Sequence, residues 1–92
     1  MLDELLILKK IKEGDIKAFE ELFRRYYFPL CCYAAGITGQ MAVAEEIVEE
    51  LFYVLWKERV RLQIFQSVKS YLYRATRNQS LQYCEHEEVR NR

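Results

Sequence analysis

Apolar residues recur at three- and four-residue steps along most of the chain, which is the period of an α-helix. The clearest run covers residues 42–58, which contain no glycine or proline. Its apolar positions form one broad stripe: Val43, Ile47, Val48, Leu51, Val54, Leu55 and Trp56. A stripe this wide must be covered by other helices. The pattern therefore predicts a central helix over 42–58 that packs inside a helical domain.

Four glutamates lie on the opposite side of this central helix: Glu45, Glu46, Glu49 and Glu50. Surface charge usually means only that a helix face is solvated. An acidic ridge is equally suited to contact a basic partner. Both interpretations stay open at this point of the chain.

The residues before the central helix predict two further helices. The first covers residues 2–13. Its apolar side is expected to hold Leu5, Leu6, Ile11 and either Leu8 or Ile7. Gly14 can end it with a left-handed residue, and Asp15 can cap the next helix. That next helix carries a second apolar set at helical spacing: Phe19, Leu22, Phe23, Tyr26, Leu30, Tyr33, Ala34 and Ile37.

Two features qualify this second helix. Pro29 lies inside the pattern and should kink or split it, because proline removes a helical hydrogen bond and clashes with the preceding turn. Residues 36–40 contain two glycines and should end the segment. Glu20–Arg24 and Glu21–Arg25 are favourable pairs four residues apart.

After the central helix, residues 59–66 lose the helical period and predict an ordered loop. Ser67 can cap a last helix that runs from Val68 to about Glu85. Its inner side is expected to hold Val68, Tyr71, Leu72, Ala75 and Gln79. Its outer side is expected to hold Lys69, Ser70, Tyr73, Arg74, Arg77 and Asn78.

The fold class follows from these elements. The helical period and the presence of only three glycines and one proline predict an all-α domain, a compact bundle of three to four helices. A length of 92 residues suits one domain with one core. We expect that core around Phe19, Leu22, Phe23, Tyr26, Ile47, Leu51, Leu55, Leu72 and Ala75.

Charge is unevenly distributed although the net charge is zero. Residues 1–58 contain seven basic and eleven acidic residues, whereas residues 59–84 contain five basic residues and no acidic one. The tail, 85–92, has two arginines and three glutamates. This asymmetry favours a basic surface that meets a polyanion.

The remaining chemistry excludes several classes of protein. The three cysteines lack metal or redox spacing and His86 is the only histidine, so we expect reduced cysteines, no metal and no cofactor. No phosphate-binding loop or catalytic set of side chains is present, so we do not expect an enzyme. The N-terminus has neither a signal peptide nor a membrane span. We therefore expect a cytoplasmic protein.

The outer side of the last helix has the groups that bind single-stranded nucleic acid. Arg74 and Arg77 can pair with phosphates, Tyr73 can stack on a base, and Asn78 can read a base edge. The competing interpretation is a solvated face whose tyrosine packs on a neighbouring helix. This face alone does not decide between them.

Three stretches together resemble region 2 of bacterial RNA polymerase sigma factors, specifically the extracytoplasmic-function (ECF) type. The first contains Gly14-Asp15-Ile16-Lys17-Ala18-Phe19, which is similar to the family's Gly-Asp-x-x-Ala-Phe opening. The second is 44–56, similar to its Ala-Glu-Asp-x-x-Gln-x-x-Phe helix. The third is 67–78, similar to its Trp-Leu-Tyr-x-x-Ala-x-Asn helix. The likeness spans about residues 5–84 with normal spacing, within one domain over 1–92.

The resemblance implies two binding partners. The second stretch would bind the clamp helices of the largest subunit of core RNA polymerase, through Glu45, Glu46, Glu49, Glu50 and Tyr53. The third stretch would engage the non-template strand of the melted promoter −10 element, through Lys69, Ser70, Tyr73, Arg74, Arg77 and Asn78. The loop before it pockets a flipped base in family members, and Phe65 and Gln66 are its candidates here. An anti-sigma factor is a further expected partner.

The sequence departs from the family pattern at a few positions. Glu49 stands where the family usually has glutamine, and Tyr71 stands where it has tryptophan. The residues after Tyr83 are acidic where the family tends to be basic. The chain ends at Arg92 without the family's −35-binding region 4. It is then either an isolated domain of a longer protein, which the polar end favours and which we expect, or a genuinely short variant. The alternative function is a degenerate sigma domain that sequesters an anti-sigma factor or polymerase without binding DNA.

Overall fold

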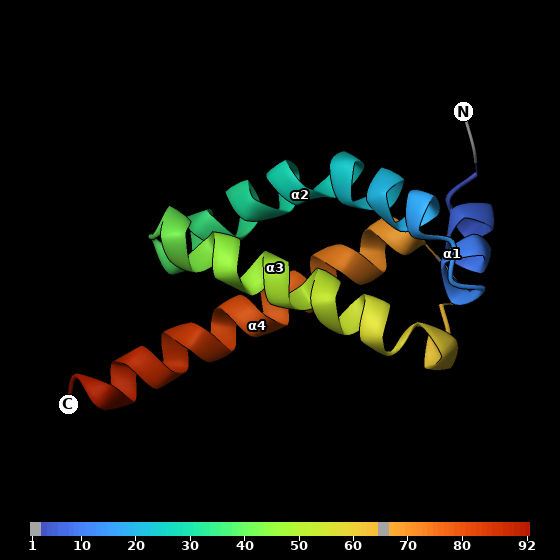
Figure 1. The fold of residues 1–92 in the computed structure, drawn as a ribbon. Helices are drawn as coiled ribbons and strands as arrows, with labels where there is room; N and C mark the ends of the chain where they lie inside the picture. The colour runs from blue at the N-terminus through green and yellow to red at the C-terminus, as the bar shows by residue number, and fades with distance from the viewer. Residues whose placement is uncertain (1–2, 65–66) are drawn as a thin grey trace.

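The computed structural model describes residues 3–64 and 67–92, which form four α-helices and one short 3-10 helix, without a strand. The elements are α1 (Glu4–Lys12), α2 (Ile16–Thr38), α3 (Met41–Lys57), η1 (Arg59–Arg61) and α4 (Val68–Arg90). α2 and α3 run antiparallel, α4 lies along both, and α1 crosses the end of the bundle where α2 begins (Figure 1). The predicted all-α bundle is confirmed.

The helix caps confirm the predicted end of α1 and the predicted starts of α2 and α4. Gly14 follows α1 with a φ of 91°, in the left-handed region that favours glycine. The Asp15 carboxylate accepts a hydrogen bond from the backbone N–H of Lys17 at 3.0 Å. The Ser67 hydroxyl oxygen accepts one from the N–H of Ser70 at 3.2 Å. Each cap satisfies a backbone donor that the helix itself leaves unpaired.

Helix α2 continues through Pro29, so of the two predicted effects, a kink or a split, the split is wrong. Its ribbon bows along its length in Figure 1, and it ends only at Gly39, which has a φ of 77°. Gly36 therefore lies within the helix. Arg24 pairs with Glu21 at 3.3 Å rather than with the predicted Glu20.

The core lies where α2 meets α3 and α4. Its buried apolar side chains are Ile7, Leu8, Ile11, Ala18, Leu22, Leu30, Cys31, Ala34, Ala44, Val48, Phe52, Leu55, Leu62, Val68 and Leu72. Phe52 is central to it, since its ring lies 5.0 Å from that of Phe23 and 6.1 Å from that of Phe19. Trp56 closes this aromatic cluster at 5.0 Å from Phe19.

The buried face of α3 differs from the predicted stripe. The fully buried residues are Ala44, Val48, Phe52 and Leu55. Four residues of the predicted stripe, Val43, Ile47, Leu51 and Val54, instead lie on the flank that faces α4. α4 approaches α3 less closely than α2 does, so this flank remains partly open.

Smaller corrections apply to α1 and α4. Leu5 and Leu6, expected on the apolar side of α1, are 48% and 41% exposed. The inner face of α4 is Val68, Leu72, Thr76 and Ser80, at steps of four residues, whereas Tyr71 and Ala75 are half-buried and Gln79 is exposed.

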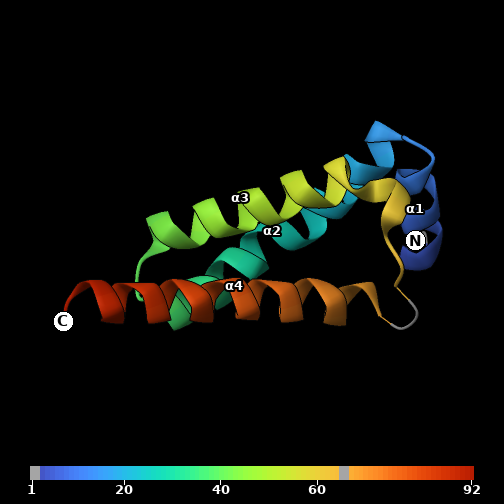
Figure 2. The same cartoon turned by 90° about the horizontal axis from the view of Figure 1, so that it is seen from below.

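Helix α4 also runs five residues beyond its predicted end, to Arg90. No glycine or proline interrupts it, and Arg90 pairs with Glu87 at 3.3 Å across one turn. Figure 2 shows this end of α4 projecting past the other helices, opposite the end that α1 covers. The acidic tail is therefore part of an extended helix.

Candidate functional site

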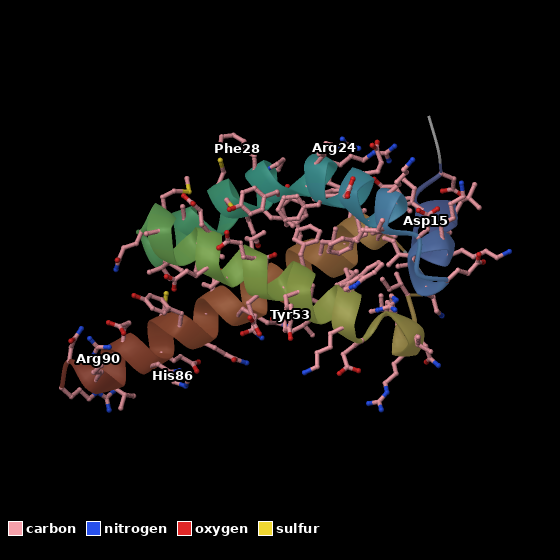
Figure 3. All side chains as sticks on the ribbon, in the orientation of Figure 1. Asp15, Arg24, Phe28, Tyr53, His86 and Arg90 are labelled. Carbon is pink, nitrogen blue, oxygen red and sulfur yellow. The ribbon has the colours of Figure 1, made fainter. Side chains whose placement is uncertain are left out.

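The predicted polymerase-binding residues form a continuous acidic ridge on the outer side of α3. We use this name for Glu45, Glu46, Glu49, Glu50 and Tyr53, all of which are exposed. Tyr53 projects from α3 one turn before the helix ends at Lys57 (Figure 3), and it is 59% exposed. Within residues 3–64 and 67–92, none of the four glutamates forms an ion pair. Their charges are therefore available to an external cation.

One edge of the acidic ridge borders an apolar groove between α3 and α4. The groove has a volume of about 400 Å³, and Glu46 and Glu50 stand on its rim. Its other lining residues are Val43, Ile47, Leu51, Val54, Gln79 and Tyr83. Apolar surface beside unpaired charge is typical of a protein-binding site.

The other edge of the acidic ridge faces α2. Burial raises the pKa of Tyr27 to about 12, and the nearby Cys31, Glu49 and Glu45 add to this rise. Burial likewise raises the pKa of the Cys31 thiol. Both groups therefore stay protonated at neutral pH, and Cys31 is a packed apolar residue rather than a reactive thiolate. Glu45 and Glu49 are exposed on this edge, and the buried interior begins beside them at Cys31.

The predicted DNA-binding residues of α4 are mostly brought together as expected. Lys69, Ser70, Arg74, Arg77 and Asn78 are all exposed. We call these five residues the basic face. None of its three cations forms an ion pair in the described part of the chain. A helix surface with unpaired cations can hold phosphates along a strand.

Tyr73 departs from its predicted place on the outer side of α4. It is half-buried, and its ring meets that of Tyr33 on α2 edge to face at a centroid distance of 5.1 Å. The competing interpretation, a tyrosine packed on a neighbouring helix, is thus correct for this residue. Tyr73 also lines a pocket formed by α1, α2 and α4.

The loop before α4 contains the remaining candidates for DNA binding. The candidates Phe65 and Gln66 lie outside the described residues. The residues ahead of them are anchored: Lys12 Nζ donates a hydrogen bond of 2.8 Å to the backbone oxygen of Leu62, and Ile64 packs against the core. Helix α1 therefore fixes where this loop leaves η1.

Sequence reasoning missed the side chains that α1 and α2 bring to the α4 surface. Glu4, Arg25, Tyr26 and Pro29 line a pocket together with Lys69 and Tyr73. Tyr26 was expected in the core and Arg25 only as the partner of Glu21. One sequence feature could have indicated this contribution of α2. The pair Arg25-Tyr26 has the same combination of a cation and an aromatic ring as α4.

Two charged surfaces dominate the described part of the domain. In the described ranges, no cluster of histidine, cysteine, aspartate or glutamate could hold a metal ion. Nor is any helix there long and apolar enough to cross a bilayer. What the surface presents is an acidic ridge on one helix and a basic face on another.

Comparison with known proteins gives one match, to a family model. No curated protein and no solved structure matches the chain significantly. The family model for sigma-70 region 2 matches residues 22–88, which is more than half of the chain and includes α3, η1 and most of α2 and α4. Sigma domains of this kind are regulatory parts of transcription initiation, act with core RNA polymerase and promoter DNA, and are not an enzyme family. The acidic ridge and the basic face are thus surfaces of a chain that belongs to the sigma-70 region 2 family.

Proposed function

We propose that this domain binds core RNA polymerase through the acidic ridge and holds the non-template strand of an opened −10 element on the basic face. The observation that carries the DNA part is the set of unpaired cations Lys69, Arg74 and Arg77 beside the exposed amide of Asn78. The cations bind phosphates whatever the sequence, while an amide can pair with a base edge. This division of roles between the cations and the amide favours a single strand whose bases are already unstacked.

The polymerase part rests on the acidic ridge and its groove. Basic side chains of the clamp helices would meet Glu46 and Glu50, and their apolar side chains would cover Ile47 and Leu51. A charged contact around an apolar centre is the usual anatomy of such an interface. A bound polymerase would present the opened strand to α4, and its capture there would keep the promoter melted.

The proposal also includes the type of sigma factor to which this domain belongs. The Gly14-Asp15 opening, with Ala18 and Phe19 after it, supports an ECF-type sigma domain. A domain of this type acts in the cytoplasm and has an anti-sigma factor as a second protein partner. The groove beside the acidic ridge is the surface where such a factor would compete with polymerase.

The test is promoter opening by holoenzyme assembled from core polymerase and the full-length protein. Asn78→Ala should relax the preference at one −10 position, at a cost of about 1–3 kcal/mol. Arg77→Ala should weaken all sequences about equally and reduce the salt dependence. Gln82→Ala is the matched control, because it removes an exposed amide from α4 one turn beyond Asn78.

The alternative is an interaction module that does not touch DNA. The inward packing of Tyr73 and the acidic end of α4 favour it. If Arg77→Ala and Asn78→Ala both open promoters as the unchanged protein does, while polymerase binding persists, the alternative replaces the DNA role.

A further inference from the structure

The apolar groove between α3 and α4 has an acidic rim. The groove has a volume of about 400 Å³, and its apolar lining includes Ile47, Leu51 and Val54. Glu46 and Glu50 stand on its rim, one helical turn apart. No basic residue lines the groove. An occupant that matches it therefore brings an apolar side chain together with two cations.

Helix α4 presents this combination on its outer side. Arg74, Arg77 and Leu81 follow one another at steps of three and four residues, which places them on one face of the helix. All three are exposed, and the exposed fraction of Leu81 is 39%. The two arginines are one turn apart, as are the two glutamates of the rim. The proposed DNA contacts make no use of Leu81.

The two surfaces do not satisfy each other within one molecule. Neither rim glutamate pairs with Arg74 or Arg77 in the ranges that the structure describes. The bundle thus leaves a groove with unpaired anions and a helix face with unpaired cations on the same chain. The net charge of the chain is zero, so two copies do not repel each other as wholes.

We propose that a second copy of this chain occupies the groove. Leu81 of that copy lies in the groove, and its Arg74 and Arg77 pair with the two rim glutamates. The contact is heterologous, because one copy contributes the groove and the other contributes α4. Each copy in such an assembly keeps its other surface free, so chains of copies grow with concentration.

The contact regulates the two proposed activities, and this part of the inference rests on the proposed function. It covers the edge of the acidic ridge that would bind polymerase, and it covers Arg77 of the basic face. The free protein is thereby held in an inactive form. Core polymerase competes for the groove and releases it. One helix face in one groove is a small interface, so the assembly is weak and reversible.

Sedimentation velocity of the protein alone, over a concentration series at low and at high salt, tests the contact. At low salt the average mass should rise above that of the monomer as the concentration increases. High salt should reverse this rise, because contacts between exposed charges are screened. A protein that stays monomeric at every concentration in low salt overturns the inference and leaves the proposed function unaffected.

An exchange of charges identifies the two surfaces. Glu46→Lys with Glu50→Lys should abolish assembly, and so should Arg74→Glu with Arg77→Glu, because like charges then face each other. An equimolar mixture of these two double variants should assemble again, since each variant offers the complement of the other. A mixture that stays monomeric, while the unchanged protein assembles, overturns this pairing.

A charge-matched control separates the proposed contact from net charge. Lys9→Glu with Lys17→Glu changes the net charge as much as the arginine double variant does, at exposed positions of α1 and α2. This control should still assemble as the unchanged protein does. Loss of its assembly would assign the effect to overall charge and overturn the pairing.

The apolar part of the contact is tested at Leu81. Leu81→Gln should weaken self-association about 3- to 7-fold, because only the exposed 39% of this side chain is removed from water on binding. Val89→Gln is the matched control, since it changes another exposed apolar residue of α4 outside the contact. Equal effects of the two variants would overturn the place of Leu81 in the groove.

Addition of core polymerase to the assembled protein distinguishes the contact from its regulatory role. Dissociation of the assembly into complexes with polymerase supports the role. Polymerase that binds the assembled protein without dissociating it overturns competition for the groove. If the charge-exchange mixture assembles but the unchanged protein does not bind polymerase, the proposed function fails and the contact between copies stands.

Discussion

The hydrogen bond from the Tyr26 hydroxyl to the Glu4 carboxylate joins α1 to α2 across 22 residues of sequence, at 2.6 Å. Arg25 reaches the same carboxylate, at 3.5 Å. A hydrogen bond to a charged group contributes about 1.5–3 kcal/mol, roughly twice a neutral one. This contact therefore stabilises the seating of the first helix on the bundle.

Tyr26→Phe should lower the free energy of unfolding by about 1.5–3 kcal/mol, because the Glu4 carboxylate loses its hydroxyl donor while the ring remains. Urea denaturation followed by circular dichroism measures the change. Tyr53→Phe is the control, since that hydroxyl is exposed on α3 and should contribute nothing. Equal stability of the two variants would show that the Glu4 contact is without energetic weight.

Stability should fall at alkaline pH. Burial, followed by the Glu4 hydrogen bond, raises the pKa of Tyr26 from 10.0 to about 12, and burial raises that of Tyr27 to about 12. Below pH 10 both hydroxyls are protonated in the folded and the unfolded chain, so their contribution is fully present. Between pH 10 and 12 the unfolded chain loses these protons first, and each group then costs up to about 1.4 kcal/mol per pH unit.

Urea titrations at pH 9 and pH 11 check this dependence. Tyr26→Phe should make the decline in stability shallower, because one of the two perturbed hydroxyls is gone. A decline of the same steepness in Tyr26→Phe and in the unchanged protein would assign it to other groups.

Local signals predicted where α1 ends and where α2 and α4 begin, while contacts between distant segments escaped prediction. Gly14 and Asp15 act within one turn of their own position, so their types alone indicate a boundary. The bond between Tyr26 and Glu4 depends on how α1 docks, which no spacing reveals. The same holds for Tyr73, whose inward rotation depends on Tyr33 of another helix.

The central helix, α3, shows why its buried positions could be predicted only in part from the sequence. Helical period shows that apolar residues share a side, but that side of α3 is wider than one neighbour can cover. The crossing of α2 decides that Phe52 is buried while Leu51 is left on the flank. The exposed site residues of α3 and α4 were easier to place, because charged side chains rarely point inward.

Phe52→Ala should destabilise the domain by about 3–5 kcal/mol, because it empties the centre of the aromatic cluster. Leu51→Ala should cost clearly less, since Leu51 is only half-buried and lines the open groove. Thermal and chemical denaturation of the two variants, compared with Val54→Ala as a control for the exposed flank, measures the order. A Leu51→Ala cost equal to that of Phe52→Ala would place the core on the originally predicted stripe.

The two edges of the acidic ridge should contribute unequally to polymerase binding. Glu46→Lys combined with Glu50→Lys reverses the edge that borders the apolar groove, and Glu45→Lys combined with Glu49→Lys reverses the edge that faces α2. Both double variants change the net charge equally, so non-specific charge effects cancel in the comparison. A partner that covers the groove excludes water there, and charges act more strongly where water is excluded. We therefore expect the groove edge to matter more.

Co-purification with core polymerase measures the effect, with circular dichroism as the check that the helices persist. Reversal of Glu46 and Glu50 should abolish the complex, while reversal of Glu45 and Glu49 should weaken it. The binding that remains should decline with added salt, because contacts between exposed charges are screened. Full binding by both double variants would rule out the acidic ridge as the polymerase surface and direct attention to α1 or the end of α4. Equal loss in both would mean that the partner rests on the crest of the ridge, around Tyr53, and leaves the groove open to a second protein.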